Sequence, residues 1–327
     1  MSSASGTEPY VILIPVFNDW QATAMLLARL DRVLLENHFR ARVLLIDDAS
    51  TEPPPEHYLR AEFQALGPME ILELRRNLGH QRAIAIGLSY VQANLPCEAV
   101  VVMDGDGEDD PQDVPRLIRR FKQAGGNKIV FAQRRKRSES LVFQAFYFLY
   151  RVLHQLLTGA GINVGNFSIV PFEALHRLVG VAELWNHYAG AVFKARLPHD
   201  LLPTERARRL AGRPRMNFVG LVMHGLSAIA IQGDIVGVRL LVATTLVILT
   251  TLAGLLTVLG IRLGTHLAIP GWATYAAGLL LVLLFQAIMI SFLFIFIILH
   301  NRQGANFLPI RDYHYFLLRI RNLPCQP

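Results

Sequence analysis

The sequence predicts an α/β domain with a mostly parallel sheet, followed by two membrane-spanning helices. In the first two hundred residues, short runs that are apolar throughout alternate with helical patterns. Such alternation is typical of parallel strands that helices cover on both faces. The remaining apolar surplus lies beyond Val236. It raises the hydrophobic share of the 327-residue chain to 52% and its mean hydropathy to +0.34, which is too apolar for an ordinary soluble enzyme.

Five apolar runs are predicted to be strands, because each is short and closed by turn-forming or polar residues. They are Tyr10–Pro15, Arg42–Ile46, Glu70–Leu74, Ala99–Met103 and Lys128–Ala132. Helical patterns lie between them at Trp20–Asn37 and Arg82–Gln92.

Polar clusters follow these predicted strands. Parallel sheets bind their ligands outside the carboxyl ends of the strands, so we expect the clusters to converge on one crevice. They are Asn18-Asp19, Asp47-Asp48, Asn77–Gln81, Asp104–Asp110 and Arg134.

Two uncharged segments, Leu240–Ile261 and Trp272–Leu299, are long enough to cross a bilayer at about 1.5 Å per residue. The short segment Arg262–Gly271 joins them, which predicts a helical hairpin. Arginines are dense before the first span and recur after the second, so the positive-inside rule predicts that both termini are cytoplasmic. The predicted organisation is a flexible start (1–8), the α/β domain with interface helices (9–235), the two spans (236–300) and a cytoplasmic tail (301–327).

Two further stretches, Leu141–Thr158 and Met216–Gln232, are amphipathic rather than fully apolar. Two interpretations stay open for them: helices of the domain core, or helices that lie in the membrane interface. Their nearness to basic residues favours the interface.

Charge and cysteine content narrow the function classes. The net charge is +7, and many arginines flank the apolar segments, which favours a membrane surface and lipid phosphate over nucleic acid. The only two cysteines, Cys97 and Cys325, are far apart, so a disulfide framework or zinc site is not expected and a reducing compartment fits. The polar start of the chain does not resemble a signal peptide, so we expect a cytoplasmic domain.

Asp104-Gly105-Asp106 places two carboxylates close together at the end of a predicted strand. A divalent cation would relieve their repulsion and could bridge them to a diphosphate. An acidic surface loop is the alternative. Similarly, Asp47-Asp48 could accept hydrogen bonds from a nucleobase and a ribose, or could form a helix cap or turn.

Four motifs, in this order and spacing, resemble family 2 glycosyltransferases with the GT-A fold. They are Pro15-Val16-Phe17-Asn18-Asp19, Asp47-Asp48-Ala49-Ser50, Asn77-Leu78-Gly79-His80-Gln81 and Asp104-Gly105-Asp106-Gly107-Glu108-Asp109. Within the family, the chain is similar to the dolichyl-phosphate mannose synthase and polyprenyl-phosphate glycosyltransferase branch. The two C-terminal spans and the basic segment Arg208–Met216 support this branch, and the likeness covers nearly the whole chain.

The resemblance implies an inverting transfer of a hexose from a UDP- or GDP-linked sugar to polyprenyl phosphate, with Mg²⁺ or Mn²⁺, in a membrane homotetramer. It also implies roles for individual residues. Donor-binding positions would be Pro15, Phe17, Asn18, Asp19, Asp47, Asp48, Gly79 and Gln81. Metal and diphosphate would be held by Asp104, Asp106 and Glu108. Arg134 and Arg137 would meet the acceptor phosphate, and Arg209, Arg213 and Arg215 would close over both substrates. A solvated basic face near anionic lipid is the alternative for these arginines.

Catalytic positions implied by the resemblance are Asp106, Asp109 and Asn166. The branch usually has Gly-Asp-Phe-Arg where this chain has Gly165-Asn166-Phe167-Ser168, so an acid and an arginine are missing. A phosphate acceptor is already ionised at pH 7 and could attack without a base, whereas a hydroxyl acceptor would need one, with Asp109 the nearest candidate. Transfer to a hydroxyl-bearing lipid and a non-catalytic nucleotide-binding scaffold therefore remain as alternatives.

Overall fold

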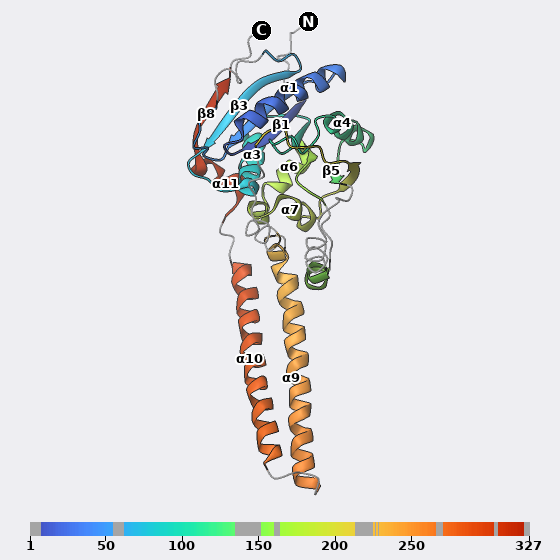
Figure 1. The fold of residues 1–327 in the computed structure, drawn as a ribbon, viewed down its shortest axis with the longest axis vertical. Helices are drawn as coiled ribbons and strands as arrows, with labels where there is room; N and C mark the ends of the chain where they lie inside the picture. Colours follow the sequence, from blue (N-terminus) through green and yellow to red (C-terminus); the bar gives the residue numbers. More distant parts are fainter. Residues whose placement is uncertain are drawn as a thin grey trace. The chain divides into compact units, whose positions relative to one another are not determined.

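The computed structural model describes residues 8–54, 62–134, 152–159, 164–212, 225, 227, 229–265, 271–303 and 307–323 (Figure 1). They fall into two compact units. The first comprises the described residues of Met1–Ser140, Ile162–Ile231 and Asn306–Pro327, and the second those of Leu141–Gly161 and Gln232–Ala305.

The first unit is built on a single eight-stranded sheet. Its strands are β1 (Tyr10–Val16), β2 (Ala41–Asp47), β3 (Leu66–Leu74), β4 (Ala99–Val102), β5 (Ile129–Arg134), β6 (Ser168–Pro171), β7 (His199–Thr204) and β8 (Leu317–Leu323). Across the sheet their order is β7-β5-β6-β4-β1-β2-β3-β8. All run in the same direction except β6 and β8, which confirms the predicted mostly parallel sheet.

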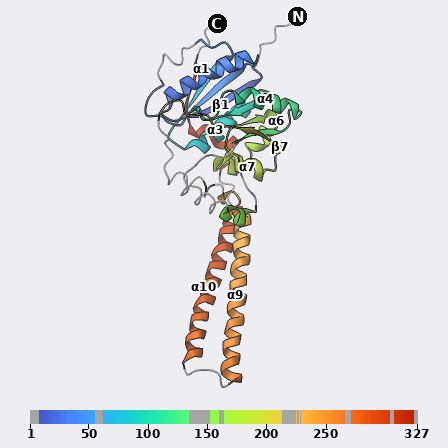
Figure 2. The ribbon, with the colours of Figure 1, turned by 45° about the vertical axis from the view of Figure 1, so that its right-hand side comes forward.

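Helices cover both faces of this sheet (Figure 2). Side chains of α1 (Trp20–Glu36) and α4 (Asp113–Gln123) pack with Ile12 and Ile14 of β1. On the other face, α3 (His80–Asn94), α6 (Phe172–Leu178) and α7 (Tyr188–Lys194) pack with Val11 and Leu13. Because successive side chains of a strand point to opposite faces, a strand covered on both sides must be apolar throughout, as β1 is.

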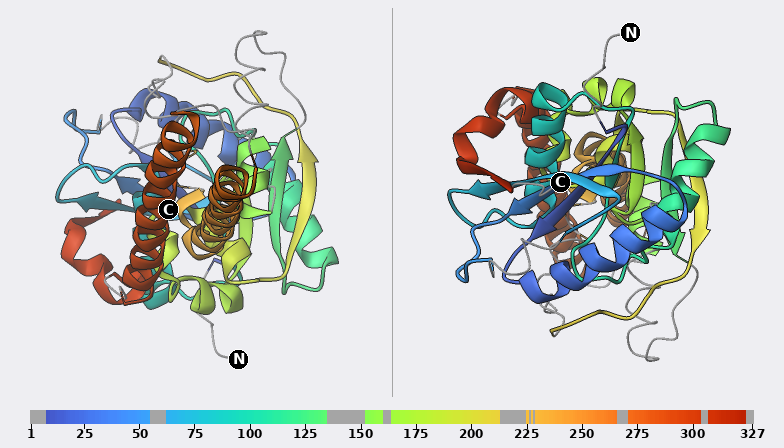
Figure 3. Two further views of the ribbon diagram at one scale, coloured as in Figure 1. Left: turned by 90° about the horizontal axis from the view of Figure 1, so that it is seen from below. Right: turned by 90° about the horizontal axis from the view of Figure 1, so that it is seen from above.

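The chain after the second unit returns to the sheet. It forms α11 (Pro309–Asp312) and a 3₁₀ turn, η2 (Tyr313–Phe316), and then β8 pairs antiparallel with β3. Residues 301–327 are predicted from the sequence to be a separate tail, whereas β8 is a strand of the sheet. Without β8, β3 would present the unpaired N–H and C=O groups of an edge strand. Figure 3 shows β8 (red) and β7 (yellow) at opposite edges of the sheet.

The second unit contains two long helices that lie side by side, α9 (Gly233–Gly264) and α10 (Trp272–Gln303). They include the two predicted spans, and both are long and apolar enough to cross a membrane. The hydroxyl of Ser291 on α10 donates to that of Thr244 on α9 at 2.9 Å. Of the two amphipathic stretches, residues 152–158 are helical, while most of Met216–Gln232 lies outside the described residues.

Candidate active site

The candidate site lies where the strand order reverses. From β1 the chain proceeds to β2 and β3 on one side, and β4 then pairs on the other side of β1. Asp19 follows β1, and Asp104 and Asp106 follow β4. In open α/β sheets, this reversal creates the crevice in which ligands bind. The polar residues that follow β1 and β4 therefore lie at this crevice.

The loops after β1 and β2 are joined by hydrogen bonds. The backbone N–H of Asn18 donates to Ser50 Oγ at 2.9 Å, and the N–H of Thr51 donates to Asn18 Oδ1 at 2.8 Å. Asp47 Oδ1 accepts from the N–H of Ser50 at 2.8 Å. Burial, opposed by these hydrogen bonds to Ser50, raises the pKa of Asp47. The two loops therefore form one rigid wall of the crevice.

Asp48 links this wall to the loop after β3. One carboxylate oxygen accepts from the N–H of Leu78 at 2.7 Å and the other from that of Gly79 at 2.8 Å. Burial raises the pKa of Asp48 in spite of these two donors. Both oxygens thus serve to place the start of α3, which the sequence alone did not indicate.

The Asp-x-Asp turn is held from inside. The buried Asp109, 2% exposed, accepts from the N–H of Asp104 at 2.9 Å. Asp106 Oδ1 accepts from the N–H of Glu108, also at 2.9 Å. Gly107, between Asp106 and Glu108, has a φ of +81°, a conformation that glycine adopts at little cost. Asp109 therefore positions the turn.

A loop that leaves β7 lies against this turn. Because β7 is parallel to β5, the loop begins at the same carboxyl edge as the other site loops. Its backbone pairs with the turn through Ala207 N–H to Glu108 O and Leu210 N–H to Asp106 O, both 3.0 Å. We call residues 205–212 the β7 loop.

Arginines of the β7 loop face the site carboxylates. Arg209 donates to Asp19 at 2.6 Å and to Asp106 at 2.9 Å, so one guanidinium joins the β1 and β4 loops. Arg206 is paired with Glu108. The sequence analysis included Arg209 in the site but not Arg206.

Among the residues that the structure describes, no group of three or more His, Cys, Asp or Glu side chains is arranged to hold a metal ion. Glu108, predicted as a third ligand, is instead paired with Arg206. Asp104 and Asp106 still fit the chemistry of Mg²⁺ or Mn²⁺, because such ions bind to one or two carboxylates together with substrate phosphates. In this structure Asp104 lies against the imidazole of His80 and Asp106 against the guanidinium of Arg209.

A series of polar contacts connects the start of α3 with the loop before β6 and with the turn after β4. The N–H of Tyr188 donates to Gln81 Oε1 at 2.7 Å, which fixes the orientation of that amide, and Gln81 Nε2 donates to Asn166 Oδ1 at 3.0 Å. Asn166 also lies 3.0 Å from His80 Nε2, which in turn is 3.0 Å from Asp104. Burial alone would lower the pKa of His80, but the neighbouring aspartates outweigh it and raise that pKa.

A family model described as glycosyl transferase family 2 matches residues 11–179, more than half of the chain. The chain belongs to glycosyl transferase family 2. It is therefore a glycosyltransferase, and the predicted family, fold class and enzyme type are confirmed.

Curated relatives of this glycosyltransferase agree with the family. It is 27% identical to the uncharacterized glycosyltransferase YkcC of Bacillus subtilis (strain 168), over 67% of both chains. It is 24% identical to the undecaprenyl-phosphate 4-deoxy-4-formamido-L-arabinose transferase of Salmonella choleraesuis (strain SC-B67), over 90% of this chain and 88% of that one.

A solved structure shares the fold. Glucosyl-3-phosphoglycerate synthase from Mycobacterium tuberculosis, in complex with Mn²⁺, uridine-diphosphate and phosphoglyceric acid, aligns with a TM-score of 0.50 and 16% identity. The alignment covers 70% of this glycosyltransferase and 79% of that chain.

Several predicted site residues are described only in part. Arg134 ends β5 opposite Thr204, but its side chain is outside the described part of the chain, as are Arg137, Arg213 and Arg215. Pro15 lies in β1, and Phe17 follows it with 37% of its side chain exposed.

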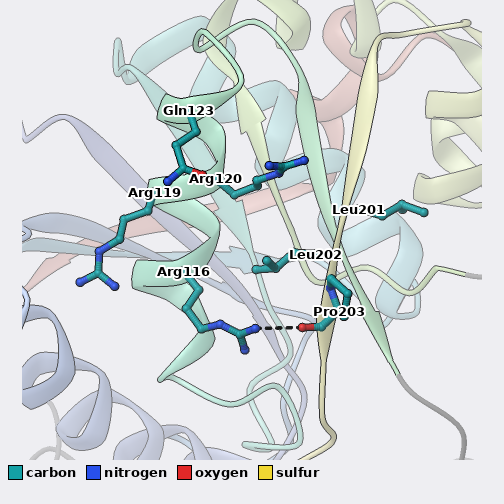
Figure 4. Close-up of a pocket in the computed structure, with 7 residues that line it drawn as sticks. All are labelled: Arg116, Arg119, Arg120, Gln123, Leu201, Leu202 and Pro203. Atoms are coloured by element: carbon teal, nitrogen blue, oxygen red, sulfur yellow. Dashed lines mark hydrogen bonds between the residues drawn. The ribbon is translucent and has the colours of Figure 1, made fainter.

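A surface groove of about 410 Å³ lies between α4 and β7, and no predicted site residue lines it. Figure 4 shows Arg116 pointing across it to the carbonyl of Pro203, which accepts a hydrogen bond at 3.0 Å. Arg120 is paired with Asp200, and Arg119 donates to Asn37. Because each guanidinium already has a partner, this groove is not the candidate site of the glycosyltransferase.

Proposed function

We propose that this glycosyltransferase moves a hexose from a nucleoside diphosphate sugar to a polyprenyl phosphate, with inversion at the anomeric carbon. The observation that carries the proposal is the contact of Arg209 with both Asp19 and Asp106. It brings the loop expected to hold the nucleoside within one side chain of the loop expected to hold the diphosphate, at the strand reversal of the sheet.

The donor would lie along the loops after β1, β2 and β4. Asn18, Asp19 and Asp47 would hold the nucleoside, with Phe17 beside it. Asp104 and Asp106 would hold a divalent cation, Mg²⁺ or Mn²⁺, which would neutralise charge on the leaving diphosphate. The solved complex of glucosyl-3-phosphoglycerate synthase with Mn²⁺ and uridine-diphosphate is consistent with this arrangement. The transfer assay identifies the nucleobase and the sugar.

An acceptor phosphate agrees with the state of Asp109. A hydroxyl acceptor requires a base that can reach it, but Asp109 is buried and holds the backbone of Asp104. A phosphate monoester is already ionised near pH 7. Its oxygen would attack the anomeric carbon as the bond to the diphosphate breaks, and the nucleoside diphosphate would leave.

The arginine-rich β7 loop supports the same acceptor, because guanidinium groups bind phosphate oxygens in pairs. The Salmonella choleraesuis relative is named for transfer to undecaprenyl phosphate. A polyprenyl chain is apolar, and the two long apolar helices of this protein would keep the enzyme at the membrane that contains it.

Membrane topology can be argued from the sheet. Strand β3 precedes α9 and α10 in the chain, β8 follows them, and the two strands are hydrogen-bonded neighbours. If the helices cross a bilayer, both ends of the pair are then on the side where the sheet lies. Together with the arginine distribution, this supports cytoplasmic termini and a cytoplasmic active site.

A transfer assay on detergent-purified protein tests the proposal. UDP- and GDP-linked sugars would be offered with undecaprenyl phosphate and Mn²⁺, and the lipid products followed by mass spectrometry. We expect a polyprenyl-phosphate hexose whose formation stops with EDTA. If the hexose instead appears on a hydroxyl-bearing lipid, the acceptor is a hydroxyl and not a phosphate. If EDTA leaves the activity unchanged, transfer does not depend on a metal ion.

Two matched variants assign the chemistry to the site. Asp106→Asn should reduce transfer by at least about a hundredfold, because it removes a charge at the diphosphate. Glu173→Gln neutralises an exposed carboxylate on α6 and should leave transfer unchanged. Equal activity of the two variants would contradict the assignment.

A further inference from the structure

One polar side chain on α10 is out of place. Gln286 lies at the centre of the apolar segment Trp272–Leu299 and is exposed. At 1.5 Å rise per residue it is roughly 20 Å from either end of that segment, too far for its side chain to reach water. Within the described part of the chain, nothing hydrogen-bonds its amide.

Several hydroxyl side chains in the two helices are hydrogen-bonded within the unit. Thr251 donates to the carbonyl of Val247 at 2.7 Å, and Thr250 and Thr257 donate to carbonyls four residues earlier. Ser291 bonds Thr244 and the carbonyl of Ala287. A primary amide has two donor hydrogens and an acceptor oxygen. Leaving them unpaired in hydrocarbon costs several kcal/mol, so Gln286 requires a partner.

The exposed side chains around Gln286 form a regular stripe. They recur at alternating intervals of three and four residues, the spacing of a coiled-coil seam. We call this stripe the Gln286 seam; it consists of Leu279, Val282, Gln286, Met289, Leu293 and Phe296. Phe296 is 73% exposed, the largest exposed fraction among the apolar members of the seam.

Contacts with α9 use a different face of α10. Ala287, 5% exposed, and Ser291 belong to that face, which lies about 100° to 140° around the helix from Gln286. The Gln286 seam is therefore free of α9 along its length, and a second helix could pack there without displacing the first.

We propose that the Gln286 seam is the surface through which two copies of this chain associate, with the two Gln286 amides hydrogen-bonded to each other. An amide is both donor and acceptor, so it is complementary to its own copy across a twofold axis. Amides bond across helices in membranes, and a single polar residue in an apolar seam sets the register and number of the associating helices. The inference rests on the proposed membrane crossing of α10, not on the proposed chemistry.

Cysteine cross-linking in native membranes tests the seam. The full chain would carry Cys325→Ser as background, and burial raises the pKa of Cys97 to about 12, which keeps that thiol slow to oxidise. Met289→Cys leaves Gln286 in place and should form a disulfide-linked dimer. Ile295→Cys, 40% exposed and about 180° around the helix from Gln286, should not. Dimer from both variants, or from neither, would overturn the proposal.

The role of the amide is tested by its removal. Gln286→Leu in the Met289→Cys background should reduce cross-linking, and in liposomes of increasing lipid-to-protein ratio should weaken association about tenfold. Gln286→Asn should retain part of the association, and Ile295→Leu, half a turn around the helix from Gln286, should leave it unchanged. If Gln286→Leu associates as strongly as the wild type, the two amides do not hold the copies together, and the proposal is wrong. Glycosyl transfer by the same variants, assayed separately, reports on the chemistry independently.

Discussion

Arg209 and Asp106 lie 2.9 Å apart, with the arginine on the loop after β7 and the aspartate on the turn after β4. The same guanidinium reaches Asp19 after β1. A protein cation thus faces a carboxylate that is proposed to bind a metal ion. The donor and its cation would have to exchange with this contact.

Removal of Arg209 should therefore separate metal binding from transfer. In Arg209→Ala, Asp106 loses a competing positive charge, so we expect Mn²⁺ without donor to bind more tightly, by about tenfold. Transfer should fall by about tenfold or more, because the charge-assisted hydrogen bonds proposed between Arg209 and the substrate phosphates are lost. Calorimetric titration and the transfer assay measure the two effects.

Arg208→Ala is the matched control, because Arg208 is exposed on the same loop. It should leave the affinity for Mn²⁺ near that of the wild type. If Arg209→Ala and Arg208→Ala have the same affinity for Mn²⁺, Arg209 does not compete with the cation.

The start of α3 should be sensitive to backbone conformation alone. Gly79 has φ +91° and ψ 155°, a region essentially restricted to glycine, and an added Cβ would meet no atom within 4 Å. Gly79→Ala should cost about 1–3 kcal/mol of stability and weaken donor binding. Gly165→Ala also has open space but no positive φ, so it should be nearly neutral in thermal unfolding. Equal shifts in the two midpoints would refute the conformational origin.

The attachment of β8 should depend on Glu73. Arg319 Nε lies 2.5 Å from its carboxylate, and Arg321 is paired with it as well. Replacing both arginines by alanine should destabilise the domain by about 2 kcal/mol, less than for a fully buried pair because the arginines are partly exposed. Glu73→Gln should restore part of this loss, and Leu318→Ala, with an exposed side chain, should have little effect. Hydrogen exchange along β3 measures the attachment; protection that stays unchanged in the double variant would rule the ion pairs out.

Acid should weaken the local structure of α11. Hydrogen bonds from Arg311 and from the N–H of Leu308 lower the pKa of Asp312 to about 2, below its ordinary value of about 3.9. A lowered pKa means that the stabilisation is complete above about pH 4 and is lost as the pH falls through about 2. The difference in stability between the wild type and Asp312→Asn should therefore shrink over this range, as followed by hydrogen exchange at α11. A difference that is independent of pH would contradict the assignment.

The sequence predicted the elements that are apolar and local. All five predicted strands and both predicted helices between them are present, because a strand covered on both faces leaves an unbroken apolar run. β6, β7 and β8 were not predicted. β7 contains Pro203, which is tolerated on an edge strand, and β8 pairs with residues more than two hundred positions earlier.

Within the site, residue types were easier to predict than residue tasks. The family resemblance implied that Asp48 holds the nucleoside, Glu108 the metal ion, and that Asp109 is catalytic. It did not imply that Asp48 and Asp109 hold neighbouring backbone or that Glu108 faces Arg206. Those tasks depend on side-chain direction and on the course of the β7 loop. His80 was visible only as a member of the cluster Asn77–Gln81.

The pairing of β3 with β8 also imposes an order on biogenesis. A ribosome completes β3 early, but β8 cannot be synthesised until both long helices have been made. Until then the β3 edge is open to other strands, and the proposed nucleoside wall lacks its outermost neighbour. The chain therefore completes its sheet only after α9 and α10 exist, so that a chain interrupted before those two helices is also left without the last strand of the sheet.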